Sequence, residues 1–259
     1  MLSEPVPVIC IPHAGAGASF FAPWLKHDLP GIVLLPAHPP GREDRIEEPP
    51  CRDLPALVQD LLANVLGAQR ELPRRVAVFG HSFGAVLAFE MARLIQDMPG
   101  ITVERVFASG SPGPREKRPK RTTGLSDEEF LDRVEELAGY RHPAFRIPAL
   151  REMLLPDLIA DVRMHEDYEP SSPEPLDVPI SSFRGADDAL VSPEAAATWR
   201  SATSREFEPV DFPGGHMYLA DDPAQILAAI AGRLTAETPG TPGTGPRDTQ
   251  PHFTKAVQL

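Results

Sequence analysis

The sequence predicts an α/β protein whose core is a mostly parallel, doubly wound β-sheet with a helical insertion. Six short runs of apolar and β-branched residues recur along the chain, and helical apolar spacing lies between most of them. Strands that alternate with helices form parallel sheets, and their functional loops follow the carboxyl ends of the strands. The alternation breaks once, between about residues 112 and 176, and this break predicts the insertion.

Each expected strand is a short apolar run bounded by charged residues, glycine or proline. The six strands are expected at residues 6–12, 31–36, 76–79, 103–110, 178–185 and 205–212. The helices with the clearest apolar periodicity are expected at residues 54–69, between Ser82 and Pro99, and at residues 192–203.

The insertion opens with the proline-rich, basic stretch PGPREKRPKRTTG and continues into two helical patterns. Ser126 and Glu129 form a capping box for the first pattern. One face of that helix is apolar and carries Phe130, Val134 and Leu137. The second pattern, residues 148–168, is rich in Met and Leu and is expected to be interrupted at Pro156. A lid over the end of the sheet is the expected arrangement, and a helical excursion packed on its side is the alternative.

Length and composition predict one globular domain followed by a tail. Of the 259 residues, 42% are hydrophobic and 24% are charged, as in ordinary soluble domains. We expect the domain to cover residues 1–235 with the insertion inside it. Residues 236–259 are rich in Pro, Gly and Thr and cannot bury a core, so this tail is expected to be disordered.

Charge and cysteine content exclude several classes of partner and location. A net charge of −12 argues against nucleic acid or an anionic membrane as the main partner, because both would be repelled. No apolar window is long enough to span a membrane, and the first residues carry no secretory signal pattern. Cys10 and Cys51 cannot form a disulfide framework, which favours a reducing compartment. We expect a cytoplasmic protein and a monomer.

A serine stands at the point where strand periodicity changes into helical periodicity. GHSFG, residues 80–84, matches the G-x-S-x-G pattern of a nucleophile elbow in the strand–turn–helix context that this motif requires. Glycines on both sides let strand and helix cross closely, and the turn places the Ser82 hydroxyl at the positive end of the following helix. Because a serine hydroxyl alone is a poor nucleophile, a base and an orienting acid are expected elsewhere.

The acid and the histidine are expected after two later strands, in that order. GADDALV places Asp187 and Asp188 at the end of the fifth strand, and FPGGHMYL places His216 on a glycine turn after the sixth. The structural alternatives are a helix-capping aspartate and an ordinary turn histidine. Their coincidence at the ends of the correct strands favours a catalytic triad.

An oxyanion hole needs two backbone N–H groups directed at the attacked carbonyl. Phe83, the residue after the serine, is expected to supply one, and Ala14 in the glycine-rich loop PHAGAGAS is the candidate for the second. The same loop lacks the third glycine of a dinucleotide fingerprint and the Gly-Lys-Ser/Thr of a Walker loop, so both of those interpretations are rejected.

Five stretches together resemble the type II thioesterases, stand-alone α/β-hydrolases of polyketide and nonribosomal peptide synthesis. They are PHAGAGASFFAPW, HPPGREDRIEEPP, FGHSFGAVLAFEMAR, GADDALVSPEAAATWR and FPGGHMYL, and they are spread over about residues 6–235. The resemblance implies an α/β-hydrolase fold with a helical lid. It also implies hydrolysis of acyl thioesters from the phosphopantetheine arm of an acyl or peptidyl carrier protein, with no metal and no cofactor of its own.

Carried over by position, the resemblance assigns roles to single residues. Ser82 is the nucleophile, His216 the general base and then acid, and Asp188 the orienting carboxylate, because G-x-x-D-x-x-V from Gly185 to Val191 matches the acid loop. Asp187 is left as a solvent residue, and Ala14 and Phe83 hold the oxyanion. The alternatives are a small-molecule esterase, a fatty acyl-carrier thioesterase and a non-catalytic binding protein of the same fold.

One dense basic cluster departs from the family pattern. REKRPKR, residues 115–121, carries five cations and one acid at the start of the expected lid: Arg115, Lys117, Arg118, Lys120 and Arg121 against Glu116. Such a patch could steer an acidic carrier protein despite the overall repulsion. The alternative is a solvated loop whose charges serve only solubility.

Overall fold

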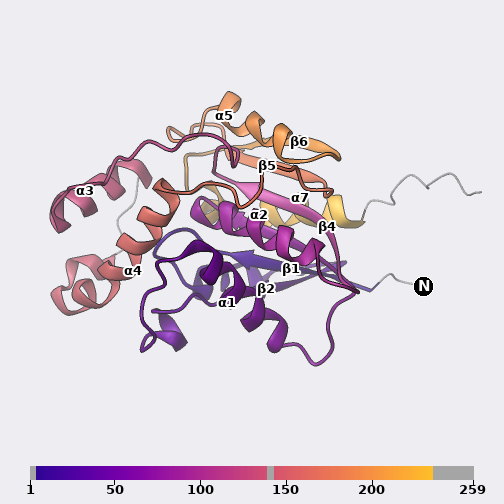
Figure 1. Ribbon diagram of the computed structural model, residues 1–259, viewed down its shortest axis with the longest axis horizontal. Coiled ribbons are helices and arrows are strands. Elements are labelled where there is room, and N and C mark those ends of the chain that lie inside the picture. The colour runs from indigo at the N-terminus through magenta and orange to yellow at the C-terminus, as the bar shows by residue number, and fades with distance from the viewer. Residues whose placement is uncertain (1–3, 139–142, 236–259) are drawn as a thin grey trace, which may run out of the picture.

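A central six-stranded sheet with helices on both faces forms the body of the computed structural model, which describes residues 4–138 and 143–235 (Figure 1). The strands are β1 (Val6–Ile11), β2 (Ile32–Pro36), β3 (Arg75–His81), β4 (Thr102–Ser109), β5 (Ile180–Gly185) and β6 (Phe207–Phe212). All neighbouring pairs are parallel, in the order β2-β1-β3-β4-β5-β6. The predicted α/β class is confirmed, and each strand lies within two or three residues of its expected bounds.

The chain reverses its direction across the sheet between β1 and β3. From β1 it passes to β2 on one side, and it then returns to place β3 on the other side of β1. The loops that follow β1 and β3 therefore diverge and leave a crevice at the carboxyl end of the sheet, where ligands of open α/β sheets bind.

Alternating side chains of the strands enter two separate cores. Ile9 and Ile11 of β1 pack toward α1 (Leu54–Gly67) and α2 (Phe83–Gln96). Val8 and Cys10 point to the opposite face, where α7 (Pro223–Thr235) closes the second core. Both faces of the sheet are thus covered, which explains the nearly continuous apolar runs in its strands.

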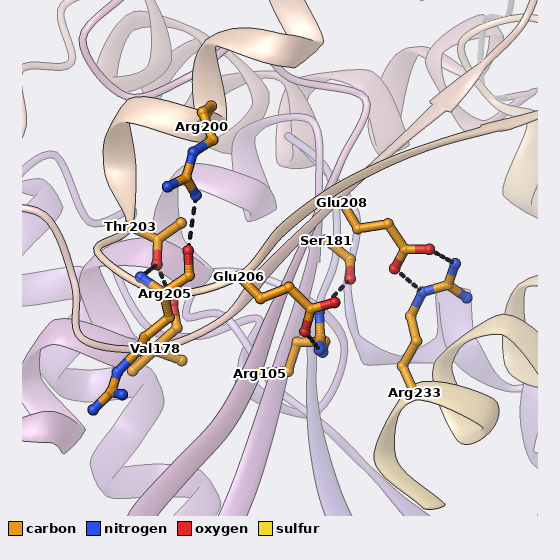
Figure 2. Close-up of polar contacts among 9 residues, drawn as sticks. All are labelled: Arg105, Val178, Ser181, Arg200, Thr203, Arg205, Glu206, Glu208 and Arg233. Atoms are coloured by element: carbon orange, nitrogen blue, oxygen red, sulfur yellow. Dashed lines mark hydrogen bonds and ion pairs between the residues drawn. The ribbon is translucent and has the colours of Figure 1, made fainter. Parts of the chain in front are cut away.

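Polar side chains tie β4, β5 and β6 together near the ends at which these strands begin (Figure 2). Arg105 donates to Ser181 Oγ at 3.0 Å and to Glu206 Oε2 at 2.6 Å. Arg233 of α7 forms a two-pronged ion pair with Glu208 of β6, at 2.6 and 2.5 Å. This end of the sheet is fixed by ion pairs and lies opposite the loops that follow the strands.

The insertion holds two helices, α3 (Asp127–Ala138) and α4 (Pro148–Glu166), with the short turn Pro143–Arg146 between them. Figure 1 shows both helices beyond the carboxyl end of the sheet. The predicted capping box is present, since Glu129 Oε2 accepts from the N–H and the hydroxyl of Ser126 at 2.9 and 2.6 Å. A small core of Phe130, Leu131, Leu155 and Leu158 joins the two helices.

Two helix predictions are corrected by the structure. Pro156 does not interrupt α4, because it lies on an exposed face where solvent can satisfy the carbonyl that its missing N–H leaves unbonded. The helix expected at 192–203 is instead α5 (Pro193–Ala197) followed by a 3₁₀ turn (Thr198–Ala202). Thr198 Oγ1 donates to Ala195 O at 2.6 Å and accepts from Gly113 N at 2.9 Å, which favours the tighter turn. The expected tail, residues 236–259, lies outside the described residues.

The backbone crossing at Gly84 generates a stability prediction. A Cβ at Gly84 would lie 2.4 Å from Ile11 O and 2.5 Å from Pro12 O, and neither backbone atom can move cheaply. We expect Gly84→Ala to lower the free energy of unfolding by about 1–3 kcal/mol, as overpacking does. Denaturant unfolding measures this loss.

The control for this prediction is Gly232→Ala, because Gly232 lies within α7 and a Cβ there meets nothing within 4 Å. This variant should be stabilised by up to about 1 kcal/mol through helix propensity. Equal stability changes in the two variants would contradict the crossing argument.

Candidate active site

Ser82 occupies a strained turn between β3 and α2. Its backbone angles are φ 55° and ψ −115°, and a positive φ is rare for a residue with a side chain. The turn is held from two sides, because Ser82 N donates to Ser109 O of β4 at 2.7 Å and Ala85 N donates to Ser82 O at 3.0 Å. This geometry is the nucleophile elbow that the GHSFG motif predicts.

Asp188 and His216 meet at the ends of β5 and β6. The distance between His216 Nδ1 and Asp188 Oδ2 is 2.9 Å, and the Asp188 side chain is fully buried. Asp188 Oδ1 accepts from the amides of Leu190 and Val191 at 2.8 and 3.3 Å. Burial raises the pKa of Asp188, but the bonds from His216 and the two amides outweigh it and hold the pKa below its ordinary value.

Ser82, His216 and Ala14 line one cavity of about 200 Å³. Leu158, Val162 and His165 of α4 form part of its wall, so the insertion covers the serine. A hydrogen bond between Ser82 and His216 is not among the contacts of the described residues. In hydrolases without substrate this bond is often long and tightens when substrate binds.

The two amides expected to form an oxyanion hole lie next to this cavity. Phe83 is the first residue of α2, so its N–H has no partner within the helix. Ala14 follows β1 and lines the cavity. Within the described part of the chain, neither amide has a hydrogen-bond acceptor, whereas the next amide of the loop, Gly15 N, donates to Asp161. Both N–H groups therefore remain without an acceptor among the described residues.

His81 forms a buried polar network beneath His216, which the sequence analysis missed. His81 Nδ1 lies 2.8 Å from Ser109 Oγ, and that oxygen lies 2.6 Å from Tyr218 OH. The rings of His81 and His216 are 4.9 Å apart. Burial, and then the proximity of His216 and His13, hold the pKa of His81 well below its usual range. A neutral His81 places no positive charge against a protonated His216. The only sequence signal was its place inside GHSFG.

A buried ionic cluster, also missed, links the loop after β1 to α4. Arg42, in the stretch HPPGREDRIEEPP, pairs with Asp161 at 2.7 Å and lies 3.8 Å from Asp157. Burial raises the pKa of Asp157 to about 6, with Arg42 lowering it and Asp161 raising it. The arginine could have been noticed in the family motif, but its partners are 115 and 119 positions away.

The basic stretch 115–121 is less open than its sequence suggests. The Arg118 guanidinium is packed over the Tyr168 ring at 4.9 Å, and burial lowers its pKa to about 10. Lys120 pairs with Asp167 at 2.6 Å, and Arg115 donates to Pro173 O. Arg118 is therefore half-buried and lines the cavity of Ser82, whereas Lys117 is exposed and remains a candidate docking cation.

A second, larger cavity of about 860 Å³ lies on the other side of α4, toward α1 and α2. Leu155, Ile159 and Met164 form its α4 wall, and Val58 and Leu94 face them. None of the predicted site residues lines it. Helix α4 is thus the wall between two cavities, of which only the smaller contains Ser82.

The comparisons with known proteins agree with this geometry. A family model described as the thioesterase domain matches residues 6–234. The chain belongs to the thioesterase family. The resemblance stated from its motifs is confirmed at this level, and so is the assignment of the protein to the thioester hydrolases.

Relatives and solved structures extend the match over the domain. This thioesterase is 31% identical to the gramicidin S biosynthesis protein GrsT of Aneurinibacillus migulanus over 228 residues, 88% of each chain. It is 31% identical to thioesterase PikA5 of Streptomyces venezuelae over 237 residues, 92% of this chain and 83% of that protein. The structure of BorB, a type II thioesterase from the borrelidin biosynthetic cluster, matches with a TM-score of 0.74 and 34% identity, covering 90% and 95% of the two chains.

Across residues 4–138 and 143–235, no helix is both long and apolar enough to cross a membrane. In the same ranges, no group of three His, Cys, Asp or Glu side chains is arranged to hold a metal ion.

The geometry separates the two adjacent aspartates. The Asp188 side chain is buried and contacts His216, whereas the side chain of Asp187 is exposed. We expect Asp188→Asn to lower kcat by about 10³–10⁴-fold, because it loses the charge that orients and stabilises the imidazolium. Asp187→Asn, the matched control, should retain kcat within about threefold. Steady-state kinetics on an acyl thioester compare them, and a larger loss in the Asp187 variant would shift the assignment by one residue.

Proposed function

We propose that this thioesterase removes acyl groups from the phosphopantetheine arm of a carrier protein, as an editing enzyme for a polyketide or nonribosomal peptide synthase. Relatives named for gramicidin S and borrelidin biosynthesis support the pathway class. The observation that carries the chemistry is the strained Ser82 turn in the cavity that His216 also lines. The proposal places the protein in the cytoplasm as a monomer without a cofactor, with a carrier protein as its partner.

The proposed first half-reaction acylates Ser82. His216 Nε2 takes the hydroxyl proton while Ser82 Oγ attacks the thioester carbonyl, and Asp188 stabilises the imidazolium through Nδ1. The amides of Ala14 and Phe83 bind the oxyanion of the tetrahedral intermediate. The carbon–sulfur bond then breaks, and the phosphopantetheine thiolate leaves with the proton held by His216.

The second half-reaction releases the acid. Water attacks the acyl-serine carbonyl while His216 takes its proton, and the same two amides bind the new oxyanion. Collapse returns the proton to Ser82 Oγ and frees the carboxylic acid. Every proton passes through His216, so its pairing with Asp188 serves both halves.

Ser82→Ala tests the proposed nucleophile. The variant should lose about 10⁴–10⁶-fold in kcat because no acyl-enzyme can form. Its melting temperature should not fall, since the change to alanine removes only the hydroxyl group and buries no polar group. A fluorophosphonate probe should label the parent protein and not the variant. Activity within tenfold of the parent would refute the triad.

The exposed part of the basic stretch provides a test of carrier docking. Lys117 and Lys120 are exposed and do not line the cavity of Ser82, and replacing both with serine leaves the half-buried Arg118 in place. We expect a several-fold loss of kcat/KM on an acyl-carrier protein, because acidic carriers would be attracted less strongly. The loss should shrink as salt rises, since exposed charges are screened over ~10 Å at 0.1 M.

The control for docking is an acyl thioester of a short thiol, which carries no protein surface. Its turnover should not change in the double variant. An equal loss on both substrates would mean that the stretch is not a docking site. A parent that hydrolyses small esters better than either thioester would favour the esterase alternative.

A further inference from the structure

One carboxylate of the lid helix binds the loop that carries an oxyanion amide. Asp161 of α4 accepts from Gly15 N at 2.8 Å through Oδ2. Gly15 directly follows Ala14, which lines the cavity of Ser82. The orientation of the peptide after Ala14 is therefore fixed by a side chain that is 146 residues away in the sequence.

Arg42 binds both the loop after β1 and the carboxylate of Asp161. Its Nη1 donates to Ala16 O at 3.1 Å and to Asp161 Oδ2 at 2.7 Å, and its Nη2 lies 3.3 Å from Asp161 Oδ1. Arg42 and Asp161 are only 7% and 3% exposed. Charge-assisted bonds of this two-pronged form hold a fixed geometry, especially where water is excluded.

The loop after β1 packs closely against α4. Gly15 has a φ of +75°, and a Cβ there would lie 2.7 Å from Leu158 Cδ1. A Cβ at Gly41, next to Arg42, would lie 2.1 Å from Asp157 Oδ1. The loop after β1, the stretch around Arg42 and helix α4 thus fit together as one unit.

We infer that Arg42 and Asp161 are positioning residues, which hold the Ala14 N–H in the orientation that binds the oxyanion and so make catalysis depend on the seating of α4. This inference rests on the proposed function, because it takes Ala14 as an oxyanion donor. Neither residue lines the cavity, so both act through the backbone of the loop.

Asp157 offers a matched control. It lies one turn before Asp161 on α4, is equally buried, and approaches the same Arg42 at 3.8 Å. Within the described residues its side chain makes no hydrogen bond to the loop after β1. Asp157→Asn and Asp161→Asn each replace a buried carboxylate beside Arg42, and only the second disturbs the contact with Gly15.

The test compares these variants on an acyl thioester of N-acetylcysteamine, which needs no carrier docking. Loss of a whole oxyanion donor costs about 10²–10³-fold in kcat, so a displaced donor in Asp161→Asn should cost about 10–100-fold. KM should stay within about threefold. Asp157→Asn should keep kcat within about threefold. The inhibition constant of an acyl trifluoromethyl ketone, whose adduct with Ser82 places an oxyanion in the hole, should rise in parallel with the loss of kcat.

Arg42→Lys provides a second, independent variant. Lysine keeps the positive charge beside Asp161 but cannot bind that carboxylate and Ala16 O with a planar fork. It should reproduce part of the kcat loss. The double variant Arg42→Lys/Asp161→Asn should have a kcat only slightly below that of the more impaired single variant, because the two residues act as one unit. If Asp161→Asn does not fold, Arg42→Lys carries the same comparison against Asp157→Asn.

Three outcomes would overturn the inference: equal kcat values for the Asp157 and Asp161 variants, a change confined to KM, or an unchanged trifluoromethyl ketone inhibition constant. Each of these leaves the parent active, so the proposed function would survive. A parent without thioesterase activity, or an active Ser82→Ala variant, would instead refute the proposed function itself.

Discussion

The close crossing of backbone at Gly80 and Gly84 is the constraint on which the site depends. A Cβ at Gly80 would lie 1.9 Å from Gly84 O, and one at Gly84 would lie 2.4 Å from Ile11 O. Without side chains at these points, the ends of β1 and β3 and the start of α2 come together. Ser82 then takes a positive φ at a cost of about 1–3 kcal/mol, which the bond from Ser82 N to Ser109 O and the surrounding packing offset. The same crossing brings the loop of Ala14 near the N–H of Phe83.

The imidazoles near Ser82 have different electrostatic surroundings. Burial, followed by neighbouring positive charge, holds the pKa values of His81 and His165 well below their usual range, so both are neutral near the serine. His216 Nδ1 lies 2.9 Å from a buried carboxylate, that of Asp188. The negative charge of Asp188 is itself kept by two backbone amides. In the proposed mechanism, the proton taken from Ser82 is held on His216, beside the negative charge of Asp188.

Sequence predicted the residues whose role follows from local pattern. Ser82, Asp188 and His216 each follow a strand of a parallel sheet, and such ends meet at one edge, so their proximity could be derived without coordinates. The pairing of Arg42 with Asp161 could not be derived in this way. Apolar periodicity does not show which face of a lid helix turns toward a loop 119 residues earlier in the sequence. Arg118 was placed among surface cations for a similar reason. Its aromatic partner, Tyr168, lies beyond both lid helices, and only the fold brings them to 4.9 Å.

Helix α4 connects substrate fit to chemistry through three of its faces. Leu158 and Val162 touch the cavity of Ser82, Ile159 faces the larger cavity behind, and Asp161 holds Gly15. An acyl group that leaves α4 seated also leaves the Ala14 amide in place. An acyl chain that pushes α4 toward the larger cavity moves Asp161 with the helix. Because the oxyanion contact weakens steeply with misalignment, such a substrate is penalised in the transition state rather than in binding. Discrimination among acyl groups then lies in kcat, which suits an enzyme that must leave correct chains on their carrier.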